Sequence, residues 1–163
     1  MNLGTKGIEL IKSYEGCRLQ AYLCPAGAWT IGWGHTAGVY EGQVITQEEA
    51  DRMFLEDVRI YSNAVEKYQE RFNFTYSWID ALTSFAYNCG IGALANVMSL
   101  CNTKKEIAEE CKLYNKGGGV VLAGLVRRRE EEYNLFMSDM ENEVPSQEVN
   151  TNADTYTVKS GDT

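Results

Sequence analysis

The chain has 163 residues, 44% of them hydrophobic, and its formal net charge is −8, with 15 Lys and Arg against 23 Asp and Glu. This length predicts one globular domain with a sizeable core and a short appendage, and it excludes a large two-domain enzyme. No Lys/Arg cluster is interleaved with aromatic residues, so the acidic balance argues against nucleic acid or an anionic membrane as a partner.

The first predicted element is a helix near the start of the chain. Thr5 is predicted to cap it, and the helix is predicted to end near Glu15. Ile8, Ile11 and Tyr14 recur at helical spacing and would form its inward face.

Residues 17–45 have a different character, because they are rich in glycine, aromatic and β-branched residues. Pro25 and Gly27 mark a turn, and we predict a small antiparallel sheet of two or three short strands. The rest of the domain is predicted to be helical, with capping boxes at Thr46–Glu49 and Thr103–Glu106. The predicted helices cover 46–68, 77–89, 93–100, the stretch after Thr103 and 122–140, with a glycine loop at 117–119. A small sheet between an N-terminal helix and a helical lobe is an α+β pattern.

Composition changes at Glu141, where the chain becomes polar and lacks core residues. We therefore predict a folded domain over residues 1–140 and a linker over residues 141–154. Residues 155–163 follow, and the run from Tyr156 to Thr163 resembles the opening strand and turn of a LysM module, the peptidoglycan-binding repeat. A whole module is several times longer, so we expect a longer parent protein with a wall-binding domain.

Cysteine usage and the N-terminal sequence bear on the compartment and on metal binding. Five cysteines without a Cys-x-x-Cys pair, and a single histidine, predict no structural zinc site. We expect reduced thiols in a chain made in a cytoplasm, and a single disulfide remains the alternative. Residues 1–16 show no signal-peptide pattern, and the longest apolar run, Val120–Val126, is too short to span a bilayer. We expect synthesis in the host cytoplasm without membrane insertion.

Three polar side chains near the start follow a definite spacing. Glu15 is followed by eight residues and Cys24, then by five residues and Thr30. A glycosidase can use such a set, because an acid protonates the leaving oxygen while groups on the other face of the sugar hold or activate water.

This spacing resembles the motif of the phage-type lysozymes, glycoside hydrolase family 24: Glu, eight residues, Asp or Cys, five residues, Thr. The run Thr30–His35 resembles the Thr-Ile-Gly-x-Gly-His segment that follows in the family. Phe85–Gly92 is similar to its Phe-x-x-Asn-x-Gly segment, and Gly124–Glu132 is similar to its Gly-Leu-x-x-Arg-Arg-x-x-Glu helix. The resemblance covers residues 5–138.

The resemblance implies a lysozyme-like fold and a cofactor-free endolysin or muramidase. Such an enzyme cleaves the β-1,4 bond between N-acetylmuramic acid and N-acetylglucosamine in the peptidoglycan of the bacterial cell wall. Glu15 would be the general acid, and Cys24 and Thr30 would position water. The chain departs from the family pattern at Cys24, where Asp is commoner, and at Tyr114, where relatives often have Trp. We expect a monomer whose partner is peptidoglycan and which reaches the wall by a separate route of release.

Four further residues could bind substrate: Tyr22, Trp29, Trp33 and His35. Strand side chains alternate between faces, so about half of such aromatics should belong to the core, and Trp29 and Trp33 should share a face. A lone histidine after a glycine is most often a structural donor, for example to a carboxylate, and tuning of Glu15 or Cys24 by His35 is the alternative. The Arg127–Arg129 run is predicted to be a solvated helix surface with Glu partners.

The character of Cys24 leaves alternatives open. A thiol has a reference pKa of about 8.5, which a nearby carboxylate would raise, so the predicted form at neutral pH is uncharged. Cys24 with His35 as base could instead form a wall peptidase or amidase. A lytic transglycosylase, in which a sugar hydroxyl replaces water, and a non-catalytic wall-binding protein also remain.

Overall fold

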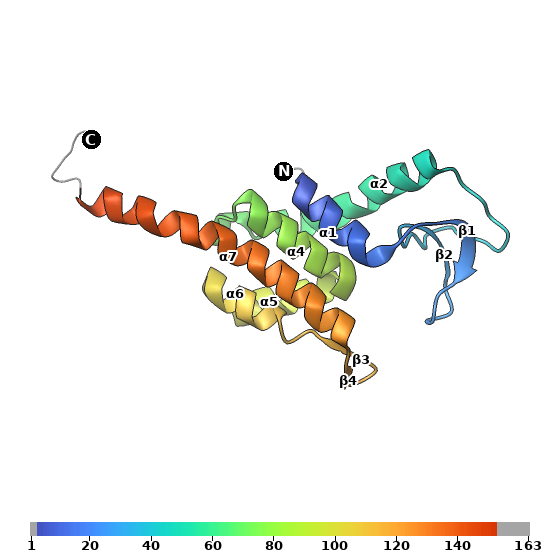
Figure 1. Ribbon diagram of the computed structural model, residues 1–163. Coiled ribbons are helices and arrows are strands. Elements are labelled where there is room, and N and C mark those ends of the chain that lie inside the picture. The colour runs from blue at the N-terminus through green and yellow to red at the C-terminus, as the bar shows by residue number, and fades with distance from the viewer. Residues whose placement is uncertain (1–2, 153–163) are drawn as a thin grey trace.

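The protein, seen here in a computed structural model, has an α+β fold with a helical lobe and a small sheet at one end (Figure 1). The structure describes residues 3–152, so the LysM-like run from Tyr156 lies outside the described residues. The elements in chain order are α1 (Thr5–Glu15), β1 (Arg18–Leu23), β2 (Trp29–Gly32), α2 (Gln47–Glu66), α3 (Gln69–Phe72), α4 (Tyr76–Cys89), α5 (Ile91–Leu100), α6 (Lys104–Cys111), β3 (Lys116–Gly117), β4 (Val120–Val121) and α7 (Ala123–Asn152).

The start of α1 is fixed by a residue of another helix. The prediction that Thr5 caps α1 is wrong: Gly4 is the N-cap and makes no side-chain cap bond. Instead Asp80, on α4, accepts hydrogen bonds from the backbone N–H of Gly4 at 2.7 Å and of Gly7 at 3.2 Å. Burial raises the pKa of Asp80, and the two amide bonds oppose that rise. This contact anchors α1, and therefore Glu15 at its other end, to α4.

Gly7 of α1 lies directly against Asp80 of α4. A Cβ at Gly7 would lie 2.8 Å from the Leu3 side chain and 2.9 Å from Asp80. We expect Gly7→Ala to lower the free energy of unfolding by about 1–3 kcal/mol, because α1 must move away from Asp80. Gly124→Ala is the matched control in α7, since nothing lies within 4 Å of its Cβ position. It should leave stability unchanged or raise it by up to about 1 kcal/mol. Urea unfolding of both variants measures this, and an equal effect of the two substitutions would contradict the prediction.

The main sheet is a two-stranded antiparallel hairpin. Tyr22 is paired with Thr30 and Leu23 with Trp29, and the register is irregular between Arg18 and Tyr22. An isolated bridge joins Gln20 to Val44. The sheet itself has two strands in the described residues, the lower of the two numbers predicted. The hairpin therefore places the Cys24 turn and Thr30 next to each other.

The glycine run at 117–119 differs from its prediction as a loop. Lys116–Gly117 and Val120–Val121 form a second hairpin, joined by Gly118 and Gly119 at φ of 58° and 81°. Two consecutive left-handed residues suit the twist of a two-residue hairpin turn, and glycine adopts them at low cost. The two glycines thus form the turn that lets the flanking residues pair as strands.

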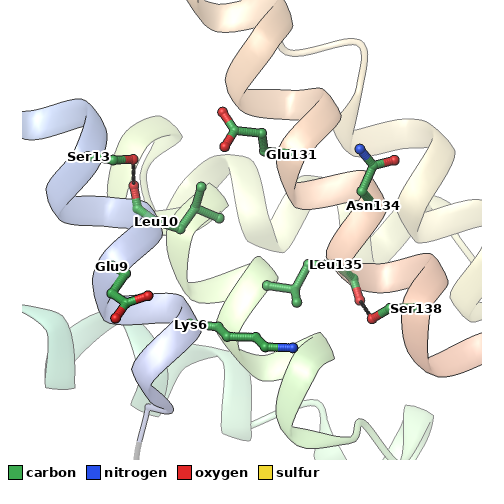
Figure 2. Close-up of a pocket in the computed structure, with 8 residues that line it drawn as sticks. All are labelled: Lys6, Glu9, Leu10, Ser13, Glu131, Asn134, Leu135 and Ser138. Carbon is green, nitrogen blue, oxygen red and sulfur yellow. Dashed lines mark hydrogen bonds between the residues drawn. The ribbon is translucent and has the colours of Figure 1, made fainter.

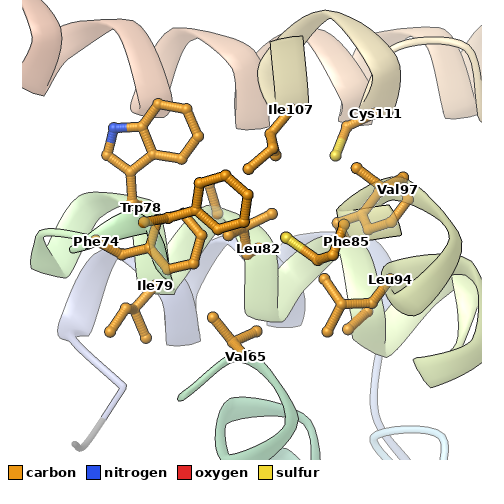
Figure 3. Packing of buried hydrophobic residues seen from close by; sticks show 14 of the residues in the cluster. Val65, Phe74, Trp78, Ile79, Leu82, Phe85, Leu94, Val97, Ile107 and Cys111 are labelled. Atoms are coloured by element: carbon orange, nitrogen blue, oxygen red, sulfur yellow. The ribbon is translucent and has the colours of Figure 1, made fainter. Parts of the chain in front are cut away.

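The helical lobe surrounds α4, which is buried along most of its length (Figure 3). Trp78 is central: its ring stacks on Phe74 at 5.8 Å and meets Phe136 of α7 at 4.3 Å between centroids. Both predicted capping boxes are confirmed, with Thr46 bonded to Glu49 at the start of α2 and Thr103 to Glu106 at the start of α6.

The last helix, α7, runs on to Asn152, so it includes most of residues 141–154, predicted as a linker, and its last turns extend past the other helices (Figure 1). Within residues 3–152, no helix has both the length and the apolar character that a bilayer crossing requires.

Candidate active site

Glu15 is the last residue of α1 and lies where the helical lobe meets the sheet. Its side chain is 22% exposed, and its Oε2 accepts a hydrogen bond of 3.0 Å from Nη1 of Arg128. In the described part of the chain, Oε1 has no hydrogen-bond partner. The backbone of Gly34 lies close to it, because a Cβ at Gly34 would be 3.2 Å from Oε1. One carboxylate oxygen is therefore held and the other is available.

The arginine that holds Glu15 belongs to a buried network, so the prediction of a solvated surface is wrong for Arg128 and Arg129. Each is 2% exposed, and Glu132 is fully buried. Arg129 binds Glu132 through two parallel bonds of 2.8 and 2.9 Å. Ser84 of α4 donates to Glu132 at 2.6 Å.

These charges can be buried because each guanidinium donates hydrogen bonds to neighbouring acceptors, which replace the water that it loses. Arg128 also donates to the Ser84 carbonyl at 3.3 Å and lies 3.5 Å from Glu132, so one guanidinium joins Glu15 to the interior of the helical lobe. Burial raises the pKa of Glu132, and the charge of Arg129 opposes that rise.

His35 is engaged at both ring nitrogens. Nδ1 lies 2.7 Å from the Asp57 carboxylate of α2, and Nε2 lies 2.9 Å from the Ala37 carbonyl. A carbonyl can only accept, so Nε2 carries a proton and donates. This is the structural role to a carboxylate that the sequence favours for His35; a contact with substrate stays a prediction.

The aromatic candidates occupy different environments. Trp33 donates from Nε1 to Asp51 at 2.8 Å and packs edge-on against Phe54, so it belongs partly to the core. The expectation that Trp29 and Trp33 share a face assumes an unbroken strand, but β2 ends at Gly32, whose φ is 64°. Tyr22 and Trp29 are half-buried in the sheet. Their contact with sugar stays a prediction.

Cys24 and Thr30 are brought together by the β1–β2 turn. The N–H of Cys24 donates to the Ala28 carbonyl at 3.0 Å, and the buried Thr30 hydroxyl donates to the same carbonyl at 3.0 Å. The pKa of Cys24 is lowered, first by the backbone of Ala28 and further by the backbones of Ala26 and Gly27. The expectation that a carboxylate would raise this pKa is wrong, because the turn directs hydrogen-bond donors toward the sulfur.

This lowered pKa has a measurable consequence. We expect iodoacetamide to label Cys24 in the folded protein at lower pH than in the urea-unfolded chain, because the thiolate is the reactive form. Labelling across a pH series, followed by mass spectrometry of the Cys24 peptide, measures this. Labelling at the same or higher pH in the folded protein would contradict the lowered pKa.

A cavity of about 290 Å³ lies beside Glu15, on the side away from the Arg128 network. Its lining comes from the end of α1, the loop after β2, α2 and α4: Glu15, Gly34, His35, Thr36, Ala37, Asp57, Ile60, Tyr61 and Tyr87. Glu15 and His35 thus share a cavity. Tyr22, Trp29 and Thr30 lie in the sheet and Cys24 lies in its turn, and none of these four lines the cavity.

A larger cavity of about 510 Å³ lies between α1 and α7, where Leu10 and Leu135 point toward the space between the helices (Figure 2). It contains none of the predicted site residues, so its size alone does not identify it as the active site. In the described residues, no group of three or more His, Cys, Asp or Glu side chains is placed to hold a metal ion.

Residue-by-residue interpretation of the sequence missed three contributors to the site: Arg128, Asp57 and Tyr87. Nothing in the spacing around Arg128 distinguishes it from an exposed ion pair, because Glu131 and Glu132 follow it at i+3 and i+4. Asp57 falls within the helix predicted over residues 46–68, but nothing in the sequence pairs it with His35.

A helix-end carboxylate, held by a buried arginine and facing a small antiparallel sheet, defines a lysozyme-like α+β protein. Solved structures agree with this class. The muramidase domain of SpmX from Asticaccaulis excentricus matches with a TM-score of 0.75 and 37% identity, covering 83% of this chain and 97% of that domain. The active form of the P1 phage endolysin Lyz matches with a TM-score of 0.76 and 26% identity, covering 86% and 87%. The predicted lysozyme-like fold is confirmed.

The sequence profile of the phage lysozyme family matches residues 12–132, and the chain belongs to this family. It is 39% identical to the endolysin of Bacillus phage B103 over 173 residues, which cover 100% of this chain and 65% of that relative. It is 37% identical to the endolysin of Acyrthosiphon pisum secondary endosymbiont phage 1, covering 85% of this chain and 99% of that relative. The chain thus spans slightly less than two thirds of the length of the Bacillus phage endolysin.

Proposed function

We propose that this protein is an endolysin-type muramidase that hydrolyses the β-1,4 bond between N-acetylmuramic acid and N-acetylglucosamine in bacterial peptidoglycan. The observation that carries the proposal is the environment of Glu15. Arg128 fixes Oε2, whereas Oε1 lies beside the cavity without a partner in the described residues. A fixed carboxyl with one available oxygen suits proton donation to a leaving sugar oxygen.

Cys24 and Thr30 are proposed to hold the attacking water on the opposite side of the sugar. Their hydrogen bonds within one turn keep them adjacent. The lowered pKa of Cys24 makes its thiolate easier to form than that of an ordinary cysteine, and a thiolate accepts a hydrogen bond from water better than a thiol does. Tyr22, Trp29, Trp33 and His35 remain proposed substrate contacts.

The geometry of His35 weighs against the peptidase alternative. A base for Cys24 needs a free imidazole nitrogen, but both nitrogens of His35 face acceptors within the fold. Membership of a lysozyme family supports the glycosidase as well. Action on the cell wall as a monomer, and a LysM module beyond residue 154, complete the proposal.

The experiment is digestion of purified peptidoglycan with reducing ends and free amines assayed in parallel. We expect new reducing ends from the wild type and a loss of at least about a thousandfold in Glu15→Gln, which keeps the shape of the side chain but cannot donate the proton. Cys24→Asp should retain activity if the residue holds water, and Cys24→Ser should lower it.

Three results would overturn the proposal. Free amines that disappear in Cys24→Ser but persist in Glu15→Gln would establish the peptidase. Saccharide binding by the wild type without release of either product would establish a wall-binding protein. Anhydro sugar products in place of reducing ends would identify the transglycosylase.

A further inference from the structure

We propose that Tyr87 is a positioning residue for Glu15: its hydroxyl holds the Trp33 carbonyl so that the backbone of Gly34 closes against the free carboxylate oxygen. The inference rests on the proposed function, because it assigns Tyr87 a part in the reaction of Glu15.

The contact of Tyr87 with the loop after β2 is direct. Tyr87 lies near the end of α4, and its hydroxyl donates to the Trp33 carbonyl at 2.8 Å. The ring is held on two sides, since its centroid lies 5.1 Å from that of Tyr61 and 5.9 Å from that of Phe54. A donor on a packed aromatic ring has little freedom to move, so the position of the carbonyl is fixed by the helical lobe.

The residue after Trp33 is the one that meets Glu15. A Cβ at Gly34 would lie 3.2 Å from Oε1 of Glu15 and 3.7 Å from the Tyr87 hydroxyl. The hydroxyl, the Gly34 backbone and the carboxylate are therefore in one place, at the wall of the cavity beside Glu15. A shift of the Trp33 carbonyl would move the Gly34 backbone relative to Oε1.

Other anchors of this loop lead elsewhere. Trp33 is tied to Asp51 and His35 to Asp57, and both carboxylates belong to α2. Among the described residues, the Tyr87 bond is the hydrogen bond that joins this loop to α4, the helix that also anchors the start of α1 through Asp80. Tyr87 thus fixes the loop to α4, the helix that also anchors α1, at whose end Glu15 lies.

The hydroxyl is suited to constant donation. Burial raises the pKa of Tyr87, and the negative charges of Glu15 and Asp57 raise it further. The group stays protonated throughout the pH range in which a glycosidase of this kind would work. It therefore acts as a fixed donor and not as an acid or base.

The test is Tyr87→Phe, which removes the hydroxyl and keeps the ring. We expect kcat on soluble, uncrosslinked peptidoglycan strands to fall about tenfold while KM stays within about twofold, because misplaced reacting groups lower the rate after binding. Tyr133→Phe is the matched control. It removes a hydroxyl that donates to Glu109 at 2.7 Å, and Tyr133 does not line the cavity beside Glu15, so kcat should be unchanged.

Each variant is assayed well below its own melting temperature, so that unfolding does not enter the rates. If the wild type releases reducing ends and Tyr87→Phe retains its kcat, the role of Tyr87 is overturned while the proposed function stands. A raised KM at full kcat would make Tyr87 a binding contact, and it would also overturn the inference. Failure of the wild type itself to release reducing ends would overturn the proposed function.

Discussion

Replacing Arg129 with methionine is expected to lower the free energy of unfolding by about 3–5 kcal/mol, because it leaves a buried carboxylate without its main partner. Glu132 is fully buried and receives two hydrogen bonds from Arg129. Arg129 also donates to the sulfur of Cys89 and to the Tyr114 carbonyl, so the variant leaves those acceptors unpaired too. Denaturant unfolding measures the loss.

The expected loss depends on pH. Burial already raises the pKa of Glu132, and removing Arg129 would raise it further. A carboxyl whose pKa is raised by folding costs stability as pH rises above the value for the unfolded chain, about 4.3, since the unfolded state ionises first. The difference between wild type and Arg129→Met should therefore be small near pH 4 and grow toward pH 8.

Two further variants make the test sharp. Arg127→Met changes the exposed neighbour of this pair and should alter stability by no more than about 0.5 kcal/mol. Adding Glu132→Gln to Arg129→Met should recover a large part of the loss, because the unpaired buried charge is then gone. A double variant no more stable than Arg129→Met would show that packing, and not charge, causes the effect.

Gly34→Ala is expected to lower the rate of peptidoglycan cleavage about tenfold, because the new Cβ would push the Glu15 carboxylate by a few tenths of an ångström and a misplacement of about 1 Å costs about a hundredfold. Its new Cβ would lie 3.2 Å from Oε1 of Glu15, and its φ of 101° is strained for alanine. Either the carboxylate or the loop must move. Release of reducing ends by the purified variant is the measurement.

Gly38→Ala separates the two causes. Its φ of 72° imposes similar backbone strain, but nothing lies within 4 Å of its Cβ position. We expect a loss of stability of about 1 kcal/mol in both variants and a loss of activity in Gly34→Ala alone. Equal activity of the two variants would contradict a close approach of Gly34 to Glu15.

The elements that local sequence determines were predicted well. Capping boxes at Thr46 and Thr103 follow from four adjacent residues, and the inward face of α1 follows from its spacing. The start of α1 was predicted wrongly because its cap, Asp80, is 76 residues away from Gly4. A local sequence pattern cannot predict a hydrogen-bond partner so far away in the chain.

The same reason explains the errors at the site. Arg-Arg followed by Glu at helical spacing is the pattern of exposed ion pairs, and only the packing of α4 against α7 shows that Arg128 is buried. The proposed role of the Tyr87 hydroxyl depends on its hydrogen bond to the Trp33 carbonyl, on a loop 54 residues earlier. The trio of Glu15, Cys24 and Thr30 could be proposed because its family spacing is itself a sequence property.

The bond between Glu15 and Arg128 also has a consequence for the nascent chain. The two residues are 113 positions apart, so the ribosome has to add this many residues after Glu15 before the carboxylate can be held. At ordinary elongation speeds this interval is roughly 6 to 23 seconds. Fragments that end before α7 lack the arginine, and we expect them to be without wall-degrading activity. Translation itself would then delay the appearance of a lytic enzyme until the part of α7 that carries Arg128 has been made.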